Sequence, residues 1–362
     1  MVDFRVSNNI TVQSYKGHYS VSFQQYGIDQ LNEKPIKDAI YIIDHNISQL
    51  YEKKLQNILS NERVIKIIAT EENKSLDKFP GYVDELVRLN VRRQQTLIAI
   101  GGGIIQDITC FLATTVMRGL PWIFYPTTLL AQSDSCIGSK SSINSGEVKN
   151  ILGTFTPPDR VVIDVDFLKT LEQREIFSGI GEMIKVHAIN SPESFNLISE
   201  RYEELFINPM IIEDFIYSSL SMKKKLIEID EFDLGPRNVM NYGHSFGHAI
   251  ESVTNYQIPH GIAVTIGMDI ANFVAVDLGV SNISNFERMH NVLNKNCNTY
   301  RHIDINVSLL LKALSKDKKN SSTQLRLILP DHNGLIGIGL YDNNDKLNES
   351  LKKYFELYGG VN

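Results

Sequence analysis

Short apolar segments alternate with helix-like segments through the first half of the chain, and this alternation limits the fold more than any other feature. Five runs are rich in apolar, β-branched or aromatic residues, at residues 39–43, 64–68, 96–100, 122–125 and 161–165. Each run is followed by a turn or capping residue, and most are followed by a helical pattern. Continuously apolar strands joined by helices predict a mostly parallel sheet covered by helices.

After residue 171 the pattern changes to long helical periods, at residues 175–189, 211–229, 241–253, 263–278 and 285–293. Two later apolar runs, 325–329 and 335–340, predict a hairpin, and residues 346–357 predict a final helix. The sequence therefore predicts an α/β domain over residues 1–174 and a mainly helical domain over residues 175–362. A length of 362 residues agrees with two domains that each bury a core.

The composition excludes a disordered or collagen-like chain. The chain has 36 Lys and Arg against 42 Asp and Glu, a net charge of −6, and 43% hydrophobic residues, as in an ordinary globular protein. An acidic chain has no general electrostatic reason to bind nucleic acid or an anionic membrane. An anionic ligand would therefore need a local cluster of basic residues.

The cysteines and the N-terminus predict a cytoplasmic protein. Cys110, Cys136 and Cys297 are far apart and form no CxxC pair, which favours a reducing compartment over a disulfide framework or a thiolate zinc site. The N-terminal residues contain no apolar segment of a secretory signal, and charged or polar residues interrupt the most apolar stretches. We expect neither a membrane nor a nucleic-acid partner.

Three consecutive glycines, Gly101, Gly102 and Gly103, lie between a predicted strand and a predicted helix. Glycines at such a place let a phosphate approach the backbone N–H groups of a helix N-terminus. Gln106 stands where the dinucleotide-binding fingerprint needs its third glycine, so the run is compatible with a nucleotide site or with a tight turn. Asp44, at the end of another predicted strand, is either a ribose ligand or a helix cap.

Histidines and a carboxylate form a second group of candidate residues. His244 and His248 are four residues apart, so a helix places both imidazoles on one face, which Asn241 shares. His260 follows where a second helix begins, and Glu182 lies on an earlier helix. Imidazoles and a carboxylate with open coordination positions suit Zn²⁺ acting as a Lewis acid. The alternative is that these histidines are capping or structural groups.

Basic residues near these motifs form a third group. Most charged side chains are simply solvated, but a cationic pocket in an acidic chain suits a substrate that carries phosphate, carboxylate or both. The candidates are Arg118, Lys140, Lys149 with the adjacent Asn150, Lys185, Lys223, Arg237 and Lys318.

Taken together, these motifs resemble the sugar-phosphate cyclases and, within them, the 3-dehydroquinate synthase family. The matching stretches follow the family's order and spacing: residues 101–107, 118–119, 126–134, 138–140, 143–144, 149–153, 181–185, 230–231, 241–251, 260–261 and 317–319. The resemblance implies an N-terminal nucleotide-binding α/β domain, a C-terminal helical metal-binding domain, an active site in the cleft between them, and a homodimer.

The resemblance also implies roles for individual residues. Zinc, or cobalt in its place, would be bound by Glu182, His244 and His260, so His248 would not be a metal ligand. NAD would be bound by Asp44, Glu71, Lys74, Gly101, Gly102, Gly103, Asp107, Thr127, Thr128, Asp134, Lys140 and Lys149. The substrate phosphate would be held by His248, Asn241, Lys140, Asn150, Lys318 and Arg118, the last from the partner subunit. The rest of the substrate site would be lined by Lys149, Lys185, Lys223 and Arg237.

The implied substrate is 3-deoxy-D-arabino-heptulosonate 7-phosphate, a phosphorylated sugar acid. The implied reaction of the shikimate pathway is a transient oxidation by bound NAD, β-elimination of phosphate, re-reduction and an intramolecular aldol closure. NAD is recycled in this reaction, and the product belongs to aromatic amino acid biosynthesis.

Three positions depart from the family pattern: Gln106 and Ser139 replace glycines, and Ile262 replaces a glutamate. Paralogous cyclases that make valiolones or deoxy-inososes also vary around these loops and use substrates without a carboxylate. The presence of Lys223 and Arg237 favours an acid substrate. A metal-dependent polyol dehydrogenase and a catalytically silent NAD- or metal-binding protein remain the alternatives from other classes.

Overall fold

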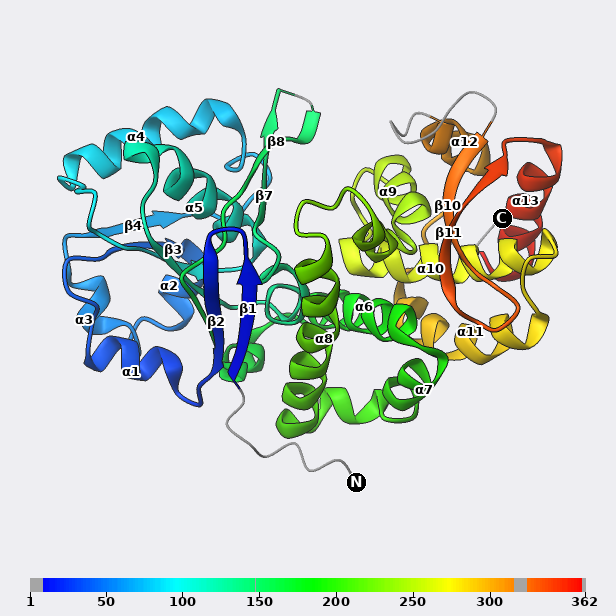
Figure 1. The fold of residues 1–362 in the computed structure, drawn as a ribbon, viewed down its shortest axis with the longest axis horizontal. Helices are drawn as coiled ribbons and strands as arrows, with labels where there is room; N and C mark the ends of the chain where they lie inside the picture. Colours follow the sequence, from blue (N-terminus) through cyan, green and yellow to red (C-terminus); the bar gives the residue numbers. More distant parts are fainter. Residues whose placement is uncertain (1–8, 147, 316–323, 360–362) are drawn as a thin grey trace. The chain divides into compact units, whose positions relative to one another are not determined.

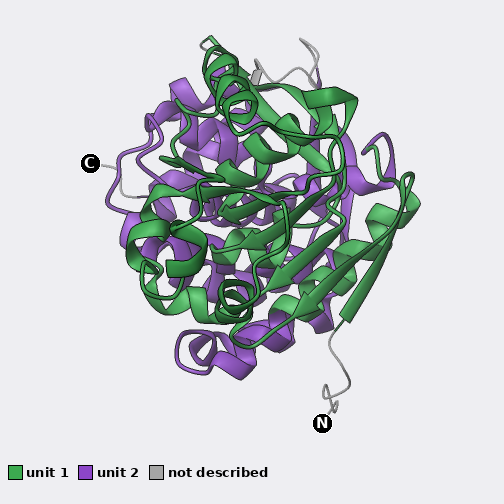
Figure 2. Ribbon diagram, turned by 90° about the vertical axis from the view of Figure 1, so that its left-hand side faces the viewer, with its two compact units in different colours: residues 1–172, 216–232 green, residues 173–215, 233–362 purple. Residues whose placement is uncertain are grey.

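The computed structural model describes residues 9–146, 148–315 and 324–359. The chain forms two compact units (Figures 1 and 2): unit 1 comprises residues 1–172 and 216–232, and unit 2 comprises residues 173–215 and 233–362. Helix α8 (Pro209–Ile229) begins in unit 2 and ends in unit 1. The sequence placed this whole helix in the second domain, because a continuous helical period does not reveal which core each half of a helix packs against.

Unit 1 is built on a seven-stranded sheet with the strand order β1-β2-β9-β6-β5-β3-β4. All neighbouring strands are parallel except the antiparallel pair β1–β2, which confirms the predicted sheet. The strands are β1 (Asn9–Ser14), β2 (Gly17–Phe23), β3 (Ile40–Asp44), β4 (Val64–Ile67), β5 (Leu97–Gly101), β6 (Trp122–Pro126) and β9 (Arg160–Ile163). A separate antiparallel hairpin pairs β7 (Lys140–Ser145) with β8 (Val148–Phe155).

Helices cover both faces of this sheet. Figure 1 shows α4 and α5 on one face and α1, α2 and α3 on the other. Side chains of Tyr41 and Ile43 on β3 enter the core beneath α1, α2 and α3, because alternate residues of a strand point to opposite faces. The helical segments are α1 (Gly27–Glu33), α2 (His45–Leu50), α3 (Gln56–Leu59), η1 (Leu76–Lys78), α4 (Phe79–Arg88), α5 (Gly103–Thr115), η2 (Val116–Arg118), the π-helical turn η3 (Ala131–Ser135) and η4 (Val165–Thr170).

The order in which the chain adds strands to the sheet reverses between β3 and β5. After β3 the chain adds β4 on one side and then returns to add β5 on the other side. In open α/β sheets, ligands bind beyond the carboxyl ends of the strands at such a reversal. Asp44 is the last residue of β3, and Gly101 is the last residue of β5.

Unit 2 is mainly helical and is organised around α10 (His260–Asp277), in which every residue from 261 to 275 is buried. A helix that is apolar on all sides belongs inside a core. The other elements are α6 (Gln173–Asn190), α7 (Pro192–Glu200), η5 (Tyr202–Phe206), η6 (Pro236–Asn241), α9 (His244–Val253), α11 (Ile283–Cys297), η7 (Asn298–Tyr300), α12 (Val307–Ser315), the hairpin β10 (Gln324–Pro330) with β11 (Ile336–Asp342), and α13 (Asp345–Tyr358). Among the described helices, none is both long enough and apolar enough to cross a bilayer.

Candidate functional site

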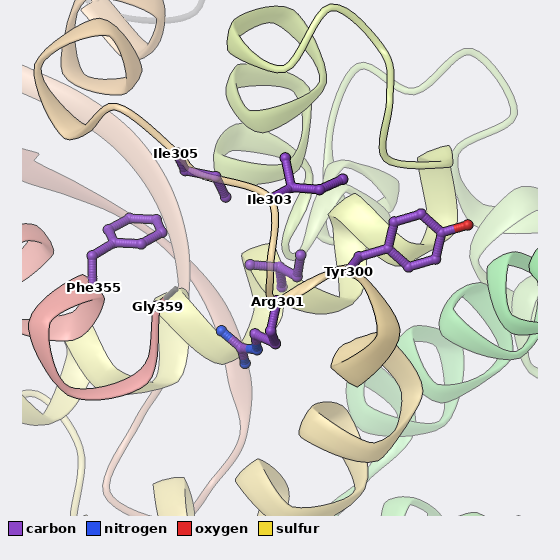
Figure 3. Close-up of a pocket in the computed structure, with 7 residues that line it drawn as sticks. Tyr300, Arg301, Ile303, Ile305, Phe355 and Gly359 are labelled. Atoms are coloured by element: carbon purple, nitrogen blue, oxygen red, sulfur yellow. The ribbon is translucent and has the colours of Figure 1, made fainter. Parts of the chain in front are cut away.

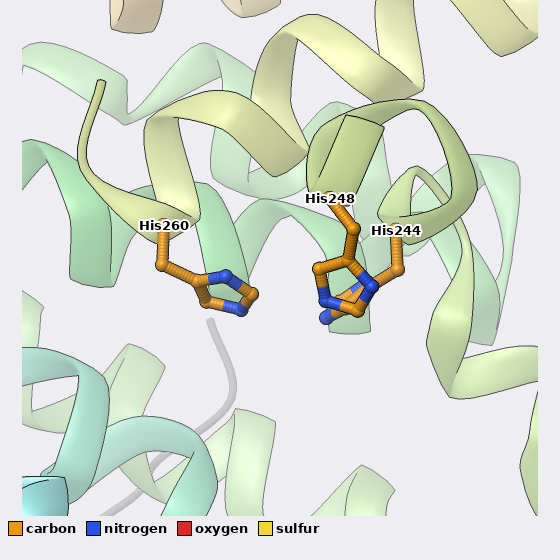
Figure 4. Close-up of side chains that lie close together, drawn as sticks. All are labelled: His244, His248 and His260. Carbon is orange, nitrogen blue, oxygen red and sulfur yellow. The ribbon is translucent and has the colours of Figure 1, made fainter. Parts of the chain in front are cut away.

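Three histidines converge in unit 2 (Figure 4). His244 and His248 extend from α9, and His260 is the first residue of α10; one ring nitrogen from each lies within 4.8 Å of the others. The Oε1 atom of Glu182, on α6, lies 3.7 Å from His244 Nε2 and 3.6 Å from His260 Nε2. The predicted metal ligands therefore lie together, with His248 beside them.

Hydrogen bonds set the orientation of two of these rings. His244 Nδ1 lies 3.2 Å from the carbonyl oxygen of Tyr242, and His260 Nδ1 lies 3.3 and 3.2 Å from the two carboxylate oxygens of Glu251. These oxygens can only accept, so each Nδ1 carries a hydrogen, and the neutral form of each ring keeps its lone pair on Nε2, an assignment made from the hydrogen-bond partners. Metal-binding histidines are commonly held in this way.

Glu182 provides the test of whether a metal fits. The residue is 1% exposed, and its Oε2 atom pairs with Lys185 Nζ. Its Oε1 atom is buried without a hydrogen-bond partner among the described residues. An unsatisfied buried carboxylate oxygen is unfavourable by roughly 1–3 kcal/mol or more. One such oxygen facing two imidazole Nε2 atoms matches the donor set of a catalytic zinc site with an open position, so these residues fit Zn²⁺ or Co²⁺.

The two rings differ in how readily they take up a second proton. Burial, reinforced by the charges of Lys185, His260 and His248, holds the pKa of His244 well below its usual 6.5, so this ring is the neutral form that a metal requires. Burial also lowers the pKa of His260, but the hydrogen bond to Glu251 and the charge of Glu182 outweigh it, and the pKa is raised. A metal cation bound to His260 Nε2 would replace the proton that this nitrogen carries in the charged ring.

The helices that carry the ligands approach each other at glycines. A Cβ atom on Gly261 would lie 1.9 Å from the carbonyl oxygen of Ser178, and one on Gly181 would lie 2.3 Å from the carbonyl oxygen of Gly261. Gly243 has a φ of +77°, and a Cβ atom there would lie 2.7 Å from the carbonyl oxygen of Val264. Each of these glycines is the chain neighbour of one predicted ligand, so the close approach brings α6, α9 and α10 together at the site.

The structure corrects the predicted place of Asn241. Helix α9 begins at His244, whereas Asn241 is the last residue of η6, and Gly243 separates them with its left-handed conformation. The expectation that Asn241 shares the helical face of His244 is therefore wrong. Its Nδ2 group donates to the carbonyl of Asn238 at 3.0 Å. Arg237, also on η6, is 4% exposed.

A second cluster of predicted residues lies in unit 1, around the buried Lys74. Its Nζ atom lies 3.2 Å from Asp107 Oδ2, 2.9 Å from Asn150 Oδ1 and 3.6 Å from Glu71 Oε1. The N–H and hydroxyl groups of Ser142 donate to the carboxylate of Asp107. Burial raises the pKa of Asp107, and Lys74 opposes this shift. Residues predicted to contact NAD or phosphate thus form one connected polar network.

Asp134 and Lys223 form another pair in unit 1. Lys223 lies on the part of α8 that belongs to this unit and is 7% exposed. Its Nζ atom donates to the backbone oxygen and to Oδ1 of Asp134, both at 2.8 Å. Asp134 lies on η3, and single π-helical turns occur often at functional sites. The structure therefore groups Lys223 with the predicted NAD residues of unit 1.

The contacts of the glycine loop meet the requirements of a tight turn. A Cβ atom on Gly101 would lie 2.5 Å from Ile105 Cγ1, and one on Gly102 would lie 2.8 Å from Thr128 Cγ2. Gly103 is the first residue of α5. The backbone N–H of Thr127 donates to the carbonyl of Gly101 at 2.9 Å. Nucleotide binding at this loop stays a prediction.

Two further sequence features acquire structural explanations. Asp44 caps α2, because its Oδ1 atom accepts from the N–H of Asn46 at 3.0 Å. Gln106, one of the departures from the family pattern, exchanges two hydrogen bonds of 2.7 Å with Ser135, which joins α5 to η3.

The remaining predicted basic residues are exposed or lie outside the described residues. Lys140 and Lys149 are exposed on β7 and β8, and Arg118 is exposed at the end of η2. The role of Arg118 in a partner subunit stays a prediction. Lys318 lies outside the described residues.

The sequence did not indicate the partners that orient the histidines. Glu251 closes the motif that contains His244 and His248, and an acid so near two histidines is the only signal that could have identified it. Tyr242 acts through its backbone carbonyl, which leaves no trace in residue type.

Comparisons with known proteins agree with this geometry. Residues 64–178 match the family model of the 3-dehydroquinate synthase N-terminal domain, and residues 179–320 match that of the C-terminal domain. The chain is 35% identical over 300 residues to the 3-dehydroquinate synthase of Dehalococcoides mccartyi, covering 82% of this chain and 84% of that protein. It is 33% identical over 332 residues to that of a Thermoanaerobacter species, covering 89% and 93%.

Solved structures of sugar-phosphate cyclases share the fold. A 2-epi-5-epi-valiolone synthase from Streptomyces hygroscopicus, with NAD⁺ and Zn²⁺ bound, has a TM-score of 0.82 at 24% identity and covers 94% of this chain and 97% of that chain. A 2-deoxy-scyllo-inosose synthase, complexed with carbaglucose-6-phosphate, NAD⁺ and Co²⁺, has a TM-score of 0.81 at 20% identity and covers 95% and 99%. The family models and the curated relatives together show that the chain belongs to the 3-dehydroquinate synthase family.

Proposed function

We propose that the chain is a 3-dehydroquinate synthase, a phosphate-eliminating lyase that converts 3-deoxy-D-arabino-heptulosonate 7-phosphate to 3-dehydroquinate and phosphate. The observation that carries the proposal is the unpartnered, buried Oε1 atom of Glu182, which faces His244 Nε2 and His260 Nε2 at 3.7 and 3.6 Å. Such a cluster in a member of this family supports an active enzyme over a silent binding protein.

The proposed cofactors are NAD in unit 1 and Zn²⁺ or Co²⁺ in unit 2. When bound, NAD accepts and returns a hydride, and the metal polarises a substrate oxygen. Tyr242 and Glu251 hold the Nδ1–H groups of two ligands, and Lys185 balances the second oxygen of Glu182. The Tyr242 carbonyl and the side chains of Glu251 and Lys185 thus preorganise the donor atoms before substrate arrives.

Unit 1 supplies polar groups at the sheet reversal between β3 and β5. Asp44 and the glycine loop lie at the carboxyl ends of these strands, where a dinucleotide binds in folds of this type. The network of Lys74, Asp107 and Asn150 then offers a fixed cation with hydrogen-bonding groups for NAD and the substrate phosphate.

Product analysis tests the proposal against its alternatives. The heptulosonate phosphate and sedoheptulose 7-phosphate are supplied separately with NAD⁺ and Zn²⁺, and released phosphate is measured together with the near-ultraviolet absorbance of NADH. We expect phosphate from the heptulosonate phosphate without net NADH. Phosphate from sedoheptulose 7-phosphate alone would identify a paralogous cyclase, and accumulation of NADH with a polyol would identify a dehydrogenase.

Arg237 provides a test of substrate class. A charge-assisted hydrogen bond contributes about 1.5–3 kcal/mol. Arg237→Ala is therefore expected to raise KM for the heptulosonate phosphate about 10- to 150-fold, while Arg237→Lys, which keeps the charge, retains part of the affinity. Steady-state kinetics measure both variants. An unchanged KM and kcat in Arg237→Ala would indicate a substrate without a carboxylate.

We further propose that the enzyme is a cytoplasmic homodimer, without a nucleic-acid or membrane partner, to which Arg118 of the partner subunit contributes. The three buried free cysteines support the cytoplasmic part of this proposal, and the net charge of −6 supports the absence of a nucleic-acid or membrane partner. Sedimentation of the purified chain tests the dimer.

A further inference from the structure

Ser139 has an unusual backbone conformation for a residue with a side chain. Its φ is +65°, in the left-handed region that favours glycine. The family pattern has glycine at this position. A serine here is strained, so other contacts must hold the backbone in this conformation.

The contacts of Ser139 supply this stabilisation. Its hydroxyl donates to Glu231 Oε1 at 2.5 Å, and its carbonyl accepts from the N–H of Thr156 at 2.6 Å. The preceding N–H, of Gly138, donates to the hydroxyl of Tyr19 at 3.1 Å. Ser139 is 5% exposed, so water competes little for these bonds. Hydrogen bonds made by the Ser139 side chain and by the backbone of residues 138 and 139 therefore hold the turn.

Glu231 connects this turn to a second element of unit 1. Its Oε1 atom also accepts from the hydroxyl of Ser14 at 2.6 Å, and its Oε2 atom accepts from the N–H of Tyr15 at 2.8 Å. Ser14 and Tyr15 form the turn between β1 and β2, which lies far from residue 139 in sequence. A single carboxylate after α8 thus fixes both turns, and hydrogen bonds to an ionised acceptor are the stronger kind.

We propose that Ser139 and Glu231 are positioning residues for Lys140, which binds the substrate phosphate. This inference rests on the proposed function, because the family resemblance that supports that function assigns the substrate phosphate to Lys140. Lys140 follows Ser139 directly and is the exposed first residue of β7. The hydroxyl–carboxylate bond fixes the dihedral angles of residue 139 and hence the direction in which Lys140 leaves the turn.

Ser14 offers a matched control for this proposal. Ser14→Ala and Ser139→Ala each remove one hydroxyl from the same oxygen of Glu231, but only Ser139 precedes Lys140. We expect Ser139→Ala to raise KM for the phosphorylated substrate at least about tenfold with a smaller change in kcat, the size expected for a loosened ionic contact. Ser14→Ala should lower the melting temperature while KM stays within about twofold.

Ser139→Gly separates the hydroxyl from the backbone strain. Glycine adopts the left-handed conformation without strain but cannot bond Glu231. We expect this variant to be at least as stable as Ser139→Ala and to show the same increase in KM. Glu231→Gln, which keeps an acceptor oxygen, should recover part of the affinity that Glu231→Ala loses. A wild-type KM in either Ser139 variant would overturn the proposal.

Hydrogen–deuterium exchange of the segment 138–145 provides a readout that does not depend on the substrate. Ser139→Ala should accelerate exchange there about tenfold or more, whereas Ser14→Ala should not. If the wild-type chain releases no phosphate from the heptulosonate phosphate, the proposed function fails. The exchange data and KM for sedoheptulose 7-phosphate, which also carries a phosphate, then still decide the positioning role. Unchanged exchange in Ser139→Ala would refute it.

Discussion

His260→Ala is expected to lower the affinity for Zn²⁺ at least about 100-fold and to abolish metal-dependent turnover. Loss of a partner that only orients a metal ligand lowers affinity 10- to 100-fold, so loss of a ligand itself should exceed that range. His260 lies at the start of α10, and its side chain is 36% exposed, so the substitution should leave the protein folded. Competition with a chromophoric chelator measures the affinity directly.

Two further variants calibrate this measurement. Glu251→Gln keeps the shape of the group that holds His260 Nδ1 and should reduce zinc affinity about 10- to 100-fold. His302→Ala, a change at an exposed histidine of unit 2, should leave it unchanged. Stoichiometric zinc and full turnover in His260→Ala would refute the assignment of this residue as a ligand.

Asp269→Ala is expected to lower the free energy of unfolding by about 3–5 kcal/mol, because it removes one partner of a buried charge network. The carboxylate of Asp269 is fully buried on α10. It accepts from His290 Nδ1 at 2.9 Å, from Arg301 Nη2 at 2.9 Å and from the hydroxyl of Tyr354 at 2.6 Å. The substitution would leave a guanidinium group with little access to water.

The surroundings of Arg301 explain why solvent cannot replace the lost carboxylate. Arg301 lines a narrow cavity with Ile303, Ile305 and Phe355 (Figure 3). Its volume of about 10 Å³ has space for roughly one water molecule. The Nε atom of Arg301 already lacks a hydrogen-bond partner among the described residues. Removing Asp269 would add a second unsatisfied part of the same group.

A surface ion pair provides the control, and it joins α10 and α13, the helices that carry Asp269 and Tyr354 of the buried network. Asp277 on α10 and Lys353 on α13 lie 2.7 Å apart, but their side chains are 24% and 56% exposed. Lys353→Ala should therefore lower the free energy of unfolding much less than Asp269→Ala does. Urea-induced unfolding without metal compares the variants. A loss in Asp269→Ala no greater than that in Lys353→Ala would contradict the buried network.

The sequence predicted the strands that have an apolar run and missed strands such as β1 and β8, which do not. Five largely apolar runs became strands of the parallel sheet. In β5 every residue is buried, since a strand covered on both faces needs no polar alternation. Strand β1 alternates exposed and buried residues and contains four polar side chains, and most of β8 is exposed. Neither has the continuous apolar run that identified the other strands, and β1 has only the polar–apolar alternation of a strand buried on one face.

The candidate site shows the same division. Residue spacing and family resemblance selected Glu182, His244 and His260, whose side chains lie together in the structure, because donor atoms require particular residue types. Their role as metal ligands stays a prediction. The spacing failed at Asn241, where helical periodicity was counted across Gly243, whose left-handed conformation only the structure reveals. Partners such as Glu251 depend on how the chain returns between α9 and α10, which no local pattern encodes.

The glycines at the crossings of α6, α9 and α10 make the ligand cluster intolerant of gradual change. A methyl group on Gly261 would overlap the backbone of Ser178, and relieving the overlap would move the helices apart by roughly an ångström. Metal–ligand distances tolerate only about 0.2 Å. Positions that contribute no donor atom are thus as restricted as the donors themselves. A larger residue at one of these glycines would therefore displace Glu182, His244 and His260 relative to one another.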